Sequence, residues 1–99
     1  MARFDLYRPA GSTVWLIDVQ ADFLDHLRTR VVAPLLPPNE VPARIADLHP
    51  AFEVEGQQLL MATQLMAAVP RRELGRPIAN LAAHRDDITR ALDLLLTGF

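Results

Sequence analysis

The clearest element in the 99-residue sequence is a helix at its C-terminal end. Four apolar residues recur there at the spacing of one helix face: Ile88, Ala91, Leu92 and Leu95. Asp86 and Asp87 directly precede this face, in a first turn where the helix dipole favours anions. We therefore expect one amphipathic helix in which Asp86 pairs with Arg90, and we expect Gly98 to end it just before Phe99.

The chain before this helix consists of short apolar runs that end at proline or glycine. Pro34, Pro37 and Pro38 are expected to make the third run an edge strand or to stop it early, because proline cannot donate to a sheet ladder. Residues 55–58 have the composition of a hairpin turn between the last two runs. Five runs have strand character: residues 3–7, 13–17, 29–33, 51–54 and 59–63.

The remaining stretches have weaker patterns. Residues 41–48 are ambiguous between a short helix and a short strand, and residues 64–70 are expected to be irregular. Residues 71–76, with three arginines and a glycine, are typical of a solvated loop. The sequence thus predicts a mostly β domain, a small antiparallel sheet followed by one helix. Sheets of such short strands tend to close into a barrel or to dimerise, because both arrangements hide their edges.

Composition excludes several classes of protein. The absence of cysteine excludes a disulfide framework and thiolate zinc sites. Ten basic and twelve acidic residues give a net charge of −2, which does not favour sequence-specific nucleic-acid binding. An apolar content of 51% is sufficient for the core of a single domain over residues 1–99. We expect a cytoplasmic protein without a membrane segment, because charges at Arg3, Asp5 and Arg8 interrupt any apolar signal core.

No group of residues predicts catalysis, a metal site or a cofactor site. The three histidines, His26, His49 and His84, are far apart in sequence, and Ser12 is the only serine. The four glycines are isolated, so no phosphate-binding loop is present. We therefore expect a protein that is not an enzyme and that needs no metal and no cofactor.

Charged residues between the second and third runs have two interpretations. Asp18, Asp22 and Asp25 could bind a divalent cation, but solvent-facing acids on a loop are the favoured interpretation. Arg28 and Arg30 could grip a phosphate, or they could pair across strands with acids such as Asp18, which is again favoured.

The end of the chain is unusual because residues 94–99 are apolar almost up to the carboxylate. Chain ends are normally polar and frayed. Either Phe99 folds into the core of its own domain, or it projects as an anchor for a partner. The sequence alone leaves both interpretations open.

An ordered series of residues along the whole chain resembles the CcdB family, the toxins of toxin–antitoxin modules that poison DNA gyrase. The series begins with Asp18-Val19-Gln20, continues through Arg30-Val31-Val32 and the Ala68-Val69-Pro70 turn, and closes with Asp87-Ile88 and Gly98. The resemblance implies an SH3-like barrel with a C-terminal helix, a fold shared with MazF-type endoribonucleases. It also implies a homodimer with no catalytic chemistry.

The same resemblance implies two partners. One is the A subunit of DNA gyrase, whose complex with cleaved DNA the family traps; the other is a CcdA-like antitoxin with a disordered segment that removes the toxin. The family's poisoning residues are the last three, and the matching positions here are Thr97, Gly98 and Phe99. Positions that also face gyrase correspond to Phe23, Asp93 and Leu96.

Thr97 departs from the family pattern, which has tryptophan at that position. Two alternatives therefore stay open beside gyrase poisoning. One is a protein of this fold that still binds antitoxin but does not poison gyrase. The other is a MazF-like endoribonuclease, for which only His26, Arg28 and Arg30 are candidate residues.

Overall fold

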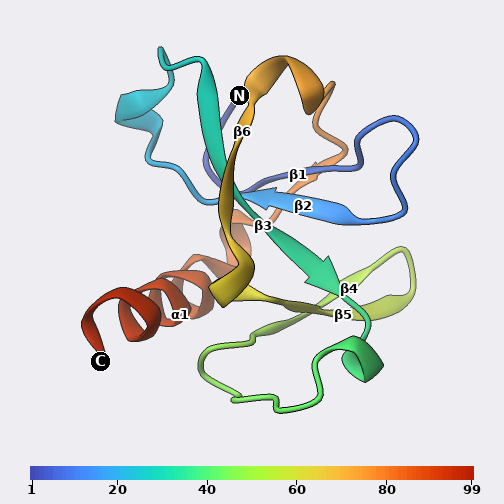
Figure 1. Cartoon of the computed structure of the whole chain (residues 1–99), viewed down its shortest axis with the longest axis vertical. Coiled ribbons are helices and arrows are strands. Elements are labelled where there is room, and N and C mark those ends of the chain that lie inside the picture. The colour runs from blue at the N-terminus through green and yellow to red at the C-terminus, as the bar shows by residue number, and fades with distance from the viewer.

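The computed structural model describes every residue from Met1 to Phe99 as one antiparallel sheet followed by one α-helix (Figure 1). The strands are β1 (Asp5–Tyr7), β2 (Trp15–Asp18), β3 (Thr29–Leu36), β4 (Ala51–Val54), β5 (Gln57–Met61), β6 (Ala67–Pro70) and β7 (Ala79–Asn80). The α-helix is α1 (Arg85–Thr97). Single 3-10 turns cover Asp22–Leu24, Pro38–Glu40, Thr63–Leu65, Arg71–Glu73 and Ala82–His84.

Strand β3 is the centre of the sheet. The strands follow the order β4-β5-β3-β2-β1-β7, and β6 pairs with β3 as well. The first half of β3 pairs with β6 (Thr29 with Pro70), and its last residues pair with β5 (Leu36 with Leu60). Because two strands share one edge of β3, the sheet curls into a half-barrel. This confirms the predicted mostly β fold with a C-terminal helix.

The prediction that the third strand lies at an edge or stops early is wrong, because β3 continues through Pro34 to Leu36 and has neighbours on both sides. Pro34 pairs with Leu16 on one side, and its carbonyl accepts a hydrogen bond from the Ala62 amide, 2.9 Å away, on the other. The N–H and C=O of a residue point to the same side of an antiparallel strand. The nitrogen of Pro34 therefore faces the gap between β5 and β6, and neither strand pairs with Pro34. The missing N–H thus removes no hydrogen bond from the sheet.

The prediction of irregular chain over residues 64–70 is also wrong. A turn at Thr63–Leu65 leads into β6, in which Ala67 and Ala68 are exposed. Alanine has little preference for strands, so pairing with β3 rather than local propensity makes this segment extended. Residues 41–48, ambiguous in the sequence, form turns and neither a helix nor a strand.

The core lies between the concave side of the sheet and α1. The predicted helix face is confirmed: Ile88, Ala91 and Leu92 are buried, and Leu95 is half-buried. The predicted Asp86–Arg90 pair is not present, and Arg90 instead lies 3.6 Å from Asp87 at the surface. The sheet residues that meet the helix include Leu6, Ile17, Ala33, Leu35, Phe52, Leu59 and Met61. Neither α1 nor any shorter helix has the length and apolarity needed to span a bilayer.

A buried ion pair joins β2 to β3. Arg30 Nε lies 2.7 Å from Asp18 Oδ2, and both side chains are completely buried. The amide of Gln20 donates to the second Asp18 oxygen over 3.0 Å, and Arg30 Nη1 reaches Asp25 Oδ1 at 3.2 Å. Burial raises the pKa of the Asp18 carboxyl, and the hydrogen bonds from Arg30 and Gln20 oppose that shift. The expected pairing of Arg30 with Asp18 is confirmed, whereas a solvent-facing Asp18 is wrong.

Replacing Arg30 with alanine should strongly destabilise the protein, because it leaves the Asp18 carboxylate buried without its counter-ion. Losing one partner of a buried pair costs about 3–5 kcal/mol. Urea unfolding monitored by circular dichroism would measure this change in unfolding free energy. Arg28→Ala, at an exposed neighbouring position, should change it little. Equal stabilities for the two variants would show that the ion pair is dispensable.

Tyr7, the only tyrosine, should titrate near pH 12. Burial raises the pKa of its phenol from 10.0 to about 12, and the nearby Asp5 carboxylate adds to the shift. Ultraviolet absorbance of the phenolate would show a midpoint near 12 in the folded protein and near 10 in denaturant. The folded state keeps the proton longer, so stability should fall as pH rises above about 10. A folded-state midpoint near 10 would contradict the burial of this ring.

Candidate partner-binding surface

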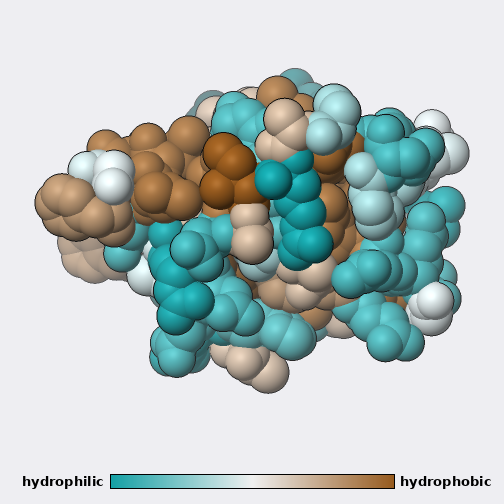
Figure 2. Space-filling view, turned by 90° about the horizontal axis from the view of Figure 1, so that it is seen from below, coloured by the Kyte–Doolittle hydropathy of each residue, from teal (hydrophilic) through white to brown (hydrophobic).

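The C-terminal end of α1 extends beyond the sheet as an apolar projection, brown in Figure 2. Phe99 is 91% exposed and Leu96 is 66% exposed. Of the two interpretations that the sequence left open for Phe99, the structure has the projecting one. The residues predicted to contact a partner at 93 and 96–99 therefore lie together at one end of the helix.

Local hydrogen bonds end the helix and set the direction of Phe99. Gly98 adopts a left-handed conformation with φ +86°, and its N–H donates to the carbonyls of Asp93 and Leu94. The Thr97 hydroxyl donates to the Asp93 carbonyl over 2.6 Å and lies 3.2 Å from Phe99 O. The side chain of Thr97 thus caps the end of the helix. Leu96 and Phe99 are the large apolar side chains that this end exposes to solvent.

Phe23 is the other large exposed aromatic residue, at 87%. It lies in the 3-10 turn Asp22–Leu24, between β2 and β3, which has no buried residue. In Figure 1 this cyan turn and the red end of α1 are well separated. The structure therefore does not join Phe23 to the other five predicted positions within one copy of the chain, and the two contact points are independent.

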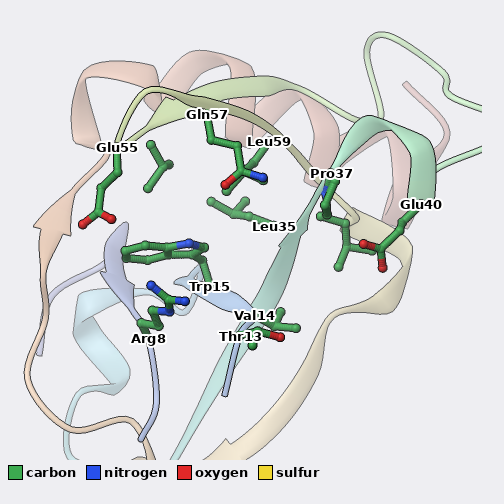
Figure 3. Close-up of a pocket in the computed structure, with 12 residues that line it drawn as sticks. Arg8, Thr13, Val14, Trp15, Leu35, Pro37, Glu40, Glu55, Gln57 and Leu59 are labelled. Atoms are coloured by element: carbon green, nitrogen blue, oxygen red, sulfur yellow. The ribbon is translucent and has the colours of Figure 1, made fainter. Parts of the chain in front are cut away.

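A cleft lined by residues of β2, β3, β4 and β5 was not anticipated from the sequence. It has a volume of about 310 Å³, and the Arg8 guanidinium lies 5.1 Å above the Trp15 ring at its base (Figure 3). Glu55 and Gln57 line one side of the opening, and Glu40 lies at the other end. Leu35, Val54 and Leu59 form its apolar walls. Residues from four separate segments meet here, so no local sequence pattern could have indicated the cleft.

The residues proposed for an endoribonuclease do not assemble into a site. Arg30 is buried and bound to Asp18, so it cannot contact a substrate. His26 and Arg28 are exposed on the loop before β3. The buried histidine, His49, accepts a hydrogen bond from the Ile45 amide at Nδ1 and lies 2.8 Å from Gln64 through Nε2. His49 therefore holds the loop before β4 in place.

Comparison with known proteins identifies the family. The family model described as CcdB protein matches residues 3–98. The chain belongs to the CcdB family. The match covers nearly the whole chain and agrees with the ordered residue series found in the sequence, and it places the protein among the toxins of toxin–antitoxin modules.

A solved structure similar to this CcdB-family protein is described as an endoribonuclease in complex with its cognate antitoxin from Mycobacterial species. The two chains superpose with a TM-score of 0.77 at 17% sequence identity, over 97% of this chain and 94% of the other. At that identity the similarity establishes a shared fold.

Removing Gly98 and Phe99 should leave the fold intact, because both residues are exposed and lie beyond the buried helix face. We expect the melting temperature to change by less than about 5 °C, the effect of about 1 kcal/mol in a domain of this size. Ile88→Ala, which empties a fully buried site on the same helix, should cost about 2–5 kcal/mol. Thermal unfolding of the three proteins measures both effects. Unfolding of the truncated protein at room temperature would place Phe99 in the core.

Proposed function

We propose that this CcdB-family toxin binds the A subunit of DNA gyrase through the C-terminal end of α1 and traps the cleaved-DNA complex. The observation that carries this proposal is the exposure of Phe99, at 91%, at the tip of an apolar helix end. Aromatic side chains that enter a partner's pocket supply much of the binding energy of an interface. Phe23 would provide a second contact on the same partner.

The proposed active form is a homodimer. Strands β4, β6 and β7 each pair with a single neighbour, so the half-barrel has open edges that a second copy could cover. A dimer would also present two helix ends and two Phe23 turns to gyrase. Two linked contacts strengthen binding when both can engage at once. In this proposal the toxin has no catalytic chemistry of its own and acts by binding.

The second proposed partner is a CcdA-like antitoxin with a disordered segment that orders on binding. The cleft above Trp15 is suited to such a peptide, because its apolar walls are bordered by Arg8, Glu40 and Glu55. The solved relative in complex with its antitoxin supports a partner of this class. The contact needs side chains and backbone groups only, so binding would require no metal and no nucleotide.

Purified gyrase provides the test of the helix end. The wild-type toxin should convert supercoiled plasmid to gyrase-linked linear DNA. Deletion of Gly98 and Phe99 should raise the required concentration at least about tenfold, since loss of an anchor costs about 2 kcal/mol or more. Thr97→Trp should lower that concentration, because it adds an aromatic ring at the surface that meets gyrase.

The matched control is Ile45→Ala, which shortens an exposed apolar side chain on the loop before β4. We expect this variant to match the wild type. Full potency in the truncated protein would place the active surface elsewhere, and no effect of wild-type toxin on gyrase would overturn the proposed function itself.

A further inference from the structure

The loop that carries Phe23 has no apolar anchor. All side chains from Ala21 to Arg28 are exposed or only partly buried. A loop of eight residues without buried side chains ordinarily samples many conformations, because little opposes its backbone entropy. Whatever orders this loop must be polar.

Three side chains outside the loop supply that order, together with two backbone amides. The Arg3 amide donates to Asp22 Oδ1 over 2.7 Å, and Gln20 Nε2 donates to the Leu24 carbonyl over 3.0 Å. Arg30 Nη1 binds the Asp25 carboxylate. The remaining contact comes from Arg71.

Arg71 follows β6 and reaches the loop from a distant part of the chain. Its amide donates to the Arg28 carbonyl over 2.9 Å, which extends the β3–β6 ladder by one step. Its Nη1 then donates to the Asp25 carbonyl over 2.7 Å and to the Leu27 carbonyl over 3.3 Å. Asp25 ends the 3-10 turn that holds Phe23, so Arg71 binds the terminal carbonyl of that turn. Hydrogen bonds from a charged donor are about twice as strong as neutral ones.

We propose that Arg71 is a positioning residue for partner binding: it fixes the turn that presents Phe23 and makes no contact with the partner itself. This inference rests on the proposed gyrase function and adds to it. A turn held in its bound conformation spares the complex the entropic cost of ordering it. Without the Arg71 guanidinium the loop keeps its bonds from Arg3, Gln20 and Arg30. Its link to the β6 side of the sheet is then reduced to the backbone hydrogen bond at Arg28.

A double-mutant cycle separates positioning from direct contact. Binding of the purified gyrase A subunit would be measured for wild type, Arg71→Ala, Phe23→Ala and the double variant. Arg71→Ala should weaken binding about tenfold in the wild-type background and by less than about twofold when Phe23 is already absent, because coupled residues do not contribute additively. An Arg71 that contacts gyrase directly would lose the same affinity in both backgrounds, and that result would overturn the inference.

Hydrogen exchange of the free toxin supplies a readout that needs no partner. Amides of residues 21–28 should exchange faster in Arg71→Ala, while those of α1 stay protected as in the wild type. Arg72→Ala, an exposed neighbour without a hydrogen bond or ion pair, is the matched control and should change neither exchange nor binding. Unchanged exchange in Arg71→Ala would overturn the inference. Wild-type toxin that binds no gyrase would instead overturn the proposed function, and with it this role of Arg71.

Discussion

The ion pair between Arg30 and Asp18 is the interaction on which the rest of the structure depends. It joins the end of β2 to the start of β3, the strand that pairs with three others. A buried charge pair is a costly way to hold two strands together, because both groups lose their hydration. The benefit of the pair is that it fixes the position of the Arg30 side chain between β2 and the loop that follows it. Arg30 also reaches Asp25, so the same guanidinium that holds the sheet helps to hold the loop beyond it.

The two proposed contact points are supported in opposite ways. Hydrogen bonds from Gln20, Arg30 and Arg71 hold the turn that carries Phe23, and this turn has no buried residue. Phe99 follows the end of α1, whose apolar face is packed into the core about two to three turns earlier. The helix end is therefore supported by the apolar packing of α1, and the turn is held by hydrogen bonds, two of them from charged arginine side chains. Binding at the turn should respond to salt and to polar substitutions more than binding at the helix end does.

The sequence predicted those elements whose signal is local. The spacing of Ile88, Ala91 and Leu92 indicates the buried face of the helix, and Gly98 indicates where the helix ends. Strand β6 could not be predicted, because Ala67 and Ala68 become a strand only by pairing with β3. The continuation of β3 past Pro34 depends on which side of the strand lacks a partner, and the sequence of one segment cannot show that.

The exposed positions at 23, 96 and 99 came from the family resemblance; periodicity alone did not decide whether Phe99 is buried. Arg71 lies in a segment read as a solvated loop, and its contacts lie 44 to 46 residues away.

Expression of the toxin in a gyrase-containing bacterium, with mapping of broken nucleic acid, tests the central claim most directly. The account predicts DNA ends covalently linked to the A subunit of gyrase, with cellular RNA intact, and loss of those ends in cells that carry a toxin-resistant gyrase. Cleaved RNA with intact DNA would contradict it, and it would assign this fold to an endoribonuclease despite the burial of Arg30.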